Sequence, residues 1–198
     1  VFIFKKLDIW DELLKKAIPI NEIHVSQKNT FGRTLFRAND YEEDSLGYIV
    51  SYADLLKVLK NKIEVLQNVH IFFNTKLENI ENFKHSKKIL IKNDGIEKEI
   101  PSNLLVLADG GRSQISGIDL IREEKEINHI ALVSIVKSKK PHYGRAYERF
   151  TKNGPIALLP NAFNTFTLVW TGPKKYIEEI VEFNKDAFLD ILQENFEK

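Results

Sequence analysis

The chain has 198 residues, a length that fits one domain or one large domain with part of another. Its 29 basic and 28 acidic side chains nearly cancel, so no overall field attracts nucleic acid or an anionic membrane surface. Cysteine is absent, which excludes disulfides and thiol nucleophiles and is consistent with a location in the reducing cytoplasm.

The first fifty residues predict one helix and three strands. Apolar residues at helical spacing predict a helix over Leu7 to Ala17, which Pro19 ends. Ile23 to Ser26 and Arg33 to Phe36 are expected to pair as strands around a turn. Gly47 to Val50 forms a third short strand in this prediction.

The next fifty residues predict a helix followed by short strands. The helix covers Tyr52 to Leu66, with Ser51 as its N-cap. A turn containing Gly95 joins the last two strands, because glycine adopts positive φ without strain. The four strands expected here are Val69 to Phe73, Lys76 to Ile80, Lys88 to Lys92 and Ile96 to Ile100.

A continuous apolar run, Leu104 to Ala108, predicts a strand buried on both faces of a parallel sheet. Asp109, Gly110 and Gly111 follow it directly. An acid and a glycine after a buried strand can bind ribose hydroxyls and let the backbone approach a pyrophosphate. Asp109 and Gly110 are therefore candidate cofactor-binding residues, although an Asp-Gly pair by itself is most often only a turn.

The last third predicts a strand, an antiparallel meander and a terminal helix. Alternation along the first meander strand places Tyr147 and Arg149 on one face and Glu148 and Phe150 on the other. The expected elements are Ile130 to Val136, Arg145 to Phe150, Ile156 to Leu159, Phe166 to Trp170 and the helix Asp186 to Phe196.

Residues 145–160, RAYERFTKNGPIALLP, and the later LVW at 168–170 resemble the aromatic-ring hydroxylases of ubiquinone biosynthesis. These are FAD-dependent monooxygenases related to para-hydroxybenzoate hydroxylase. The run LLVLADGGRS resembles the second flavin fingerprint of that family, although the family continues to an arginine where this chain has Ser116. HVS at 24–26 and GYIV at 47–50 are also similar, so the resemblance extends over roughly residues 7 to 170.

The resemblance implies an α/β fold with α+β character, in which an antiparallel or mixed sheet with helices binds the substrate. Part of a Rossmann-like FAD-binding layer accompanies it. Residues 1–20 and 47–68 would be helical pieces of the FAD domain, and 69–118 its hairpins and Asp-Gly strand. Residues 21–46 and 119–198 would form the substrate-binding sheet.

A central fragment of a longer enzyme is the expectation for this chain. The family's phosphate-binding GxGxxG precedes the first helix and its third flavin fingerprint follows the last one, and neither occurs here. Methionine, including an initiator, is also absent.

The resemblance also implies which residues bind the cofactors and the substrate. Asp109, Gly110 and Ser113 would lie near FAD and the nicotinamide, and Leu159 and Pro160 near the flavin ring. The expected substrate-binding residues are Tyr147, Arg149, Leu158 and Trp170. The alternative for the aromatic members is ordinary core packing. No catalytic side chain is expected, since the flavin carries the chemistry, and the five histidines lack the spacing of a metal site.

The implied reaction hydroxylates the ring of a prenylated phenol or quinol intermediate of ubiquinone biosynthesis, with FAD, NAD(P)H and O2. No nucleic acid partner is expected. The implied location is the cytoplasm, with peripheral attachment to the inner membrane or a complex of ubiquinone-biosynthesis proteins as further expectations. The alternative is a non-catalytic α+β binding or scaffolding domain, which the missing dinucleotide motif favours.

Overall fold

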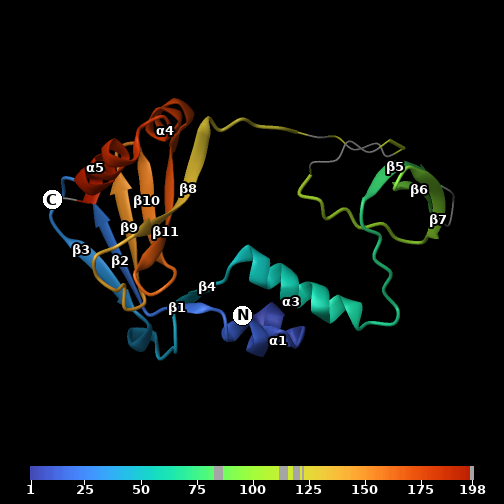
Figure 1. Ribbon diagram of the computed structural model, residues 1–198, viewed down its shortest axis with the longest axis horizontal. Coiled ribbons are helices and arrows are strands. Elements are labelled where there is room, and N and C mark those ends of the chain that lie inside the picture. Colours follow the sequence, from blue (N-terminus) through green and yellow to red (C-terminus); the bar gives the residue numbers. More distant parts are fainter. Residues whose placement is uncertain (83–86, 112–115, 118–120, 122, 197–198) are drawn as a thin grey trace. The chain divides into compact units, whose positions relative to one another are not determined.

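The computed structural model describes residues 1–82, 87–111, 116–117, 121 and 123–196. The chain divides into two compact units (Figure 1). The first comprises Val1–Val65 and Glu126–Lys198, and the second comprises Leu66–Lys125. Together they form the mixed α/β fold that the sequence predicts, with antiparallel and mixed sheets.

The first unit is built around a six-stranded sheet with the order β3-β2-β9-β10-β11-β8. Strands β9, β10 and β11 are the predicted antiparallel meander, which is confirmed. The β2–β3 hairpin is also confirmed, and β2 joins the meander by parallel pairing with β9. The bounds are β2 Glu22–Gln27, β3 Arg33–Arg37, β8 His129–Lys137, β9 Arg145–Thr151, β10 Gly154–Pro160 and β11 Thr165–Pro173.

Helices α4 (Lys174–Val181) and α5 (Lys185–Phe196) pack against one face of this sheet (Figure 1). Trp170 on β11 is fully buried there, with the rings of Tyr176 and Phe188 at 6.3 and 6.1 Å between centroids. Aromatic side chains of this size dominate a core because each removes a large apolar area from water. The other buried members are Ile156, Leu168, Ile177, Ile180 and Leu192.

Of the helix predicted over residues 7–17, the structure forms only α2 (Trp10–Leu14), and a separate short helix, α1 (Phe2–Lys6), precedes the predicted range. Asp8 interrupts them because its φ of 52° is left-handed, a conformation that cannot continue a right-handed helix. The helix after residue 51 is confirmed as α3 (Tyr52–Glu64), and the hydroxyl oxygen of Ser51 accepts the Asp54 N–H at 3.0 Å.

A second apolar cluster and a small strand pair complete the first unit. Ile9, Trp10 and Leu13 pack with Val58 of α3. The predicted strand at residues 47–50 is β4 (Gly47–Ile49), which pairs antiparallel with β1 (Ile18–Ile20). The acidic segment after β3 begins with a 3-10 turn, η1 (Ala38–Tyr41).

The second unit contains a three-stranded antiparallel sheet, and three of the four strands predicted here are confirmed. They are β5 (Thr75–Asn82), β6 (Lys87–Asn93) and β7 (Ile96–Ser102), with the β6–β7 turn at Gly95 as expected. Residues 69–73 form no strand, contrary to the prediction.

The predicted buried strand at residues 104–108 is wrong for this structure, because the segment has no strand assignment and is largely exposed. Leu104, Val106 and Leu107 are 76%, 72% and 41% exposed. A parallel strand buried on both faces needs neighbouring strands and covering helices. None of the described strands pairs with this segment.

In the described part of the chain, no helix has the length and apolar character needed to cross a bilayer.

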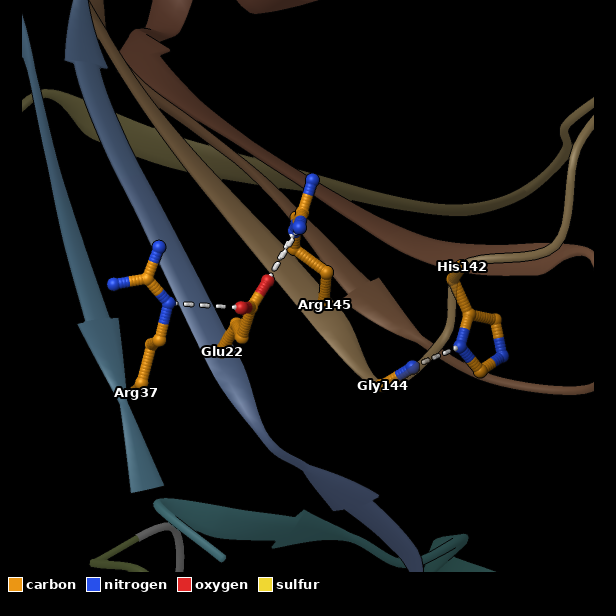
Figure 2. A network of polar contacts seen from close by, with 5 residues as sticks. All are labelled: Glu22, Arg37, His142, Gly144 and Arg145. Atoms are coloured by element: carbon orange, nitrogen blue, oxygen red, sulfur yellow. Dashed lines mark hydrogen bonds and ion pairs between the residues drawn. The ribbon is translucent and has the colours of Figure 1, made fainter. Parts of the chain in front are cut away.

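Glu22 links the three strands at one edge of the six-stranded sheet (Figure 2). Its carboxylate accepts the Nε–H of Arg145 on β9 at 2.6 Å and the Nε–H of Arg37 on β3 at 3.2 Å. The hydrogen bond from Arg145, more than any other contact, holds the pKa of Glu22 below its ordinary value. Nearby, the backbone oxygen of Gly144 accepts the Asn21 N–H at 2.8 Å, and the Gly144 N–H donates to His142 Nδ1 at 3.0 Å.

We predict that Glu22→Gln lowers the free energy of unfolding by up to about 1 kcal/mol at pH 7, since the partly exposed ion pairs are screened by solvent. The folded-state pKa of Glu22 is depressed, so its stabilisation is present above the unfolded pKa near 4.5 and is lost as pH falls below it. Urea titrations at neutral and acidic pH measure this. The variant and wild type should differ at pH 7 and converge in acid.

Glu178→Gln is the matched control, because the Glu178 side chain is exposed on α4 and makes neither a hydrogen bond nor an ion pair within the described residues. It should leave stability unchanged at both pH values. A Glu22→Gln deficit that persists undiminished in acid would contradict the assigned role of the carboxylate.

A second prediction concerns Gly154, where β10 begins. Its φ is +128°, and a Cβ there would lie 2.3 Å from the backbone oxygen of Thr171. Gly32 also has positive φ, +105°, but a Cβ there would meet nothing within 4 Å. Gly154→Ala should therefore destabilise the chain by about 1–3 kcal/mol more than Gly32→Ala. Equal unfolding midpoints for the two variants would contradict the prediction. They would mean that the backbone around Gly154 and Thr171 accommodates the added methyl group without loss of stability.

Candidate functional site

The six-stranded sheet has a second face, which α4 and α5 do not cover. Because side chains alternate along a strand, residues next to the helix-packed Leu158 point the other way. We call this side the open face, defined by Glu148, Ala157, Leu159, Val169 and Val133. Val133 and its strand neighbour Ile135 are 63% and 67% exposed, so apolar surface is available here.

Five residues of this side share one register position across five neighbouring strands. Val25 pairs with Glu148, Glu148 with Ala157, Ala157 with Val169, and Val169 with Val133. We call them the cross-strand row. Four members are apolar, and directly paired side chains in a sheet lie close enough to interact. A ligand resting on the row would therefore meet an apolar surface with a single carboxyl group.

Glu148 is half-buried in this row, and burial raises the pKa of its carboxyl group above the ordinary value. Taking a carboxylate out of water disfavours its charged form unless hydrogen bonds replace the lost solvation. Within the described residues, the carboxyl group of Glu148 makes no hydrogen bond or ion pair with the protein. The group is therefore held in a site where a hydrogen-bond donor from a ligand is favoured.

A hollow borders the same side of the sheet near β2 and β3. It has a volume of about 820 Å³ and is lined by Ile23, Phe36, Tyr41, Glu43, Ser45 and Leu46. Ile23 and Phe36 are paired residues of the two strands, and Ile23 points to the same side as Val25. Ligand sites in proteins have volumes of roughly 300–1,000 Å³ and mostly apolar walls, so this hollow is large enough for a small molecule.

The predicted substrate residues lie on the helix side of the sheet. Trp170 is fully buried, and Leu158 packs against the same core. Arg149 is 8% exposed, and its Nε–H donates to the backbone oxygen of Asn195 in α5 at 2.9 Å. The ring of Tyr147, on the same side, has the rings of His24 and Phe166 at 5.6 and 6.0 Å.

The two residues predicted to lie near the flavin ring point to opposite sides of β10. Leu159 belongs to the open face and is half-buried. Pro160 is buried on the other side, where it pairs with Phe166. Of this pair, Leu159 is the side chain that a ligand on the open face could touch.

Asp109 and Gly110 lie in the second unit, in an exposed turn. The Asp109 carboxylate accepts the Gly111 N–H at 2.9 Å. Gly110 has a φ of +71°, and nothing lies within 4 Å of the position that a Cβ would take. This combination of an accessible carboxylate and an open backbone fits the ribose or pyrophosphate part of a dinucleotide. Ser113, the third predicted member, lies outside the described residues.

Metal ligands do not gather in the described part of the chain, where no group of three or more His, Asp or Glu residues could hold an ion. The sequence analysis did not identify Glu148 as a candidate functional residue. The alternation of β9 separated Glu148 from Arg149, but it did not indicate which side the helices cover.

The family model described as FAD binding domain matches residues 1–196. Among curated proteins, the chain is 21% identical to the ubiquinone biosynthesis monooxygenase COQ6, mitochondrial, of Dictyostelium discoideum, covering 99% of this chain and 45% of the relative. It is 25% identical to COQ6 of Xenopus tropicalis, covering 94% of this chain and 42% of the relative. An uncharacterized protein of Synechocystis, slr1300, is 24% identical, covering 95% of this chain and 46% of that protein. The chain thus spans less than half the length of these relatives.

Solved structures share the fold. PqsL, a probable FAD-dependent monooxygenase from Pseudomonas aeruginosa, has a TM-score of 0.76 at 18% identity, over 97% of this chain and 54% of PqsL. The myxobacterial FAD-dependent halogenase CndH has a TM-score of 0.70 at 14% identity, over 97% and 46%. Since the family model covers nearly every residue, the chain belongs to the FAD binding domain family.

Proposed function

We propose that this chain is part of a flavin-dependent monooxygenase that hydroxylates the aromatic ring of a prenylated phenol or quinol in ubiquinone biosynthesis. The observation that carries the proposal is the similarity to COQ6 monooxygenases over 94–99% of the chain. The open face supports it, because an apolar surface with one carboxyl group suits an aromatic ring that carries a hydroxyl. FAD, NAD(P)H and O2 are the proposed co-reactants.

Asp109, Gly110 and Ser113 are the residues that we propose to bind FAD. As a separate proposal for the sheet, Leu159 is the member of the Leu159–Pro160 pair that a flavin ring would contact. Bound FAD would supply the redox chemistry of the oxygen transfer. The role of the chain is then to bind and orient the ring of the substrate and to exclude water from it. Ala157, Leu159 and Val169 offer the apolar surface for that role.

The residues on the helix side support this surface from behind. Arg149 fastens β9 to α5 through the Asn195 oxygen, and Trp170 and Leu158 anchor β10 and β11 to the core. We propose that these residues, with Tyr147, act on substrate binding through the rigidity of the sheet. Supporting residues of this kind keep a site within the small tolerances that binding geometry allows.

An apolar chain on the substrate would find complementary surface in the hollow between Ile23 and Phe36 and at Val133. Burial of apolar area contributes about 25 cal/mol per Å², so even one isoprene unit adds measurable affinity. Because such a substrate partitions into membranes, we propose peripheral action at a membrane surface. The COQ6 relatives are named as mitochondrial. For this protein we propose a location in the cytoplasm, with peripheral attachment to the inner membrane.

The complete gene product that contains this chain should hold one FAD per polypeptide, whereas the 198-residue chain alone should not. With a prenylated phenol, the complete protein should oxidise NAD(P)H faster and add one oxygen atom to the ring. Flavin absorbance, NAD(P)H consumption and product mass measure these outcomes. A complete protein without flavin, or one whose NAD(P)H oxidation ignores every phenol tested, would contradict the proposal.

Asp109→Asn in the complete protein should lower flavin content, because the amide is a weaker acceptor for hydroxyl groups than a carboxylate. Asp94→Asn is the control, since Asp94 lies in the β6–β7 turn of the same unit and asparagine tolerates its positive φ. Flavin-to-protein absorbance ratios after dialysis compare the two. Equal retention would remove Asp109 from the FAD site.

A further inference from the structure

The position of Glu148 on the open face is not accounted for by the fold. The neighbouring Arg149 cannot neutralise it, since successive residues of a strand point to opposite sides of the sheet. Arg149 is moreover committed to the backbone oxygen of Asn195. In contrast, Glu22 on the helix side accepts hydrogen bonds from both Arg37 and Arg145. Within the cross-strand row, Glu148 is the acid that faces a prospective ligand.

The neighbours of Glu148 favour a donor that is attached to an apolar ring. Val25 and Ala157 flank it on the adjacent strands, and Val169 and Val133 continue the apolar row. A hydrated cation would lose solvation on these surfaces without regaining it. A phenol, however, combines a flat apolar body with one O–H donor at its edge. Its ring can rest on the apolar row while its hydroxyl reaches the carboxyl group.

We infer that Glu148 accepts a hydrogen bond from the ring hydroxyl of the substrate, and that it thereby selects hydroxylated rings and fixes their orientation on the sheet. This inference rests on the proposed function, whose aromatic substrate it specifies further. Removing the donor from the ligand leaves the carboxyl group half-buried without a partner, which makes discrimination against ethers strong. Burial of Glu148 adds to this effect because it weakens competition from water.

The test compares two probes in the complete, FAD-loaded protein: 2-farnesylphenol and its methyl ether, 2-farnesylanisole. Equilibrium dialysis gives the two dissociation constants without any turnover. Wild type should bind the phenol about tenfold more tightly than the ether, the ratio expected for a hydrogen bond to a charged group. Glu148→Gln should reduce that ratio several-fold, and Glu148→Leu should bring it to about one, with binding of the ether retained.

Glu178→Gln on the exposed surface of α4 is the matched control and should keep the wild-type ratio. If Glu148→Leu does not fold, Glu148→Gln still decides, because it preserves the size of the side chain. A wild-type ratio in FAD-loaded Glu148→Gln, or equal affinities in wild type, would overturn the inference.

Hydroxylation of the phenol by wild type, measured separately, keeps the two failures apart. One outcome is that wild type converts the phenol while the Glu148 variants keep the wild-type ratio of phenol affinity to ether affinity. In that case the proposed function stands and the role of Glu148 is wrong. If wild type neither binds nor converts the phenol, the proposed substrate class fails and the inference fails with it.

Discussion

The packing of α4 and α5 against one side of the six-stranded sheet is the contact on which the rest of the first unit depends. Trp170, Ile156 and Leu168 fill the interface from the sheet, and Ile177 and Ile180 fill it from α4. Because strands alternate their side chains, burying this side commits the other set of residues to the open face. One hydrophobic interface thus determines both the core and the surface that is available to a ligand.

Polar contacts complete the sheet where apolar packing ends. Glu22 bridges Arg37 of β3 and Arg145 of β9, so the hairpin β2–β3 is held beside the meander in parallel pairing (Figure 2). The hydrogen bond from the Asn21 N–H to the Gly144 oxygen fixes where that pairing starts. A shift of one residue would exchange the two sides of β2, bringing Val25 to the helix side and His24 to the open face.

The meander illustrates how much of the fold could be predicted from local pattern. Gly and Pro punctuate short apolar runs between Arg145 and Trp170, and the three strands formed where those runs predicted them. The run Leu104 to Ala108 shows the limit of the method. Its composition suits a buried strand, but a strand is defined by hydrogen bonds to neighbours, and the described strands offer it none. The same limit applied to Asp8, whose left-handed φ keeps the helix predicted from Leu7 from starting before Trp10.

The sequence by itself determined the antiparallel meander, the Ser51 cap and the resemblance to flavin-dependent hydroxylases, because these follow from residue order over short distances. It also separated Glu148 from Arg149 by the alternation of β9. Only the tertiary structure decided which of these two side chains points toward the core. The direction depends on α5, which packs against the sheet from more than forty residues later in the chain. Long-range packing therefore moved Trp170 and Arg149 into support of the sheet and left Glu148 and Leu159 on its open face.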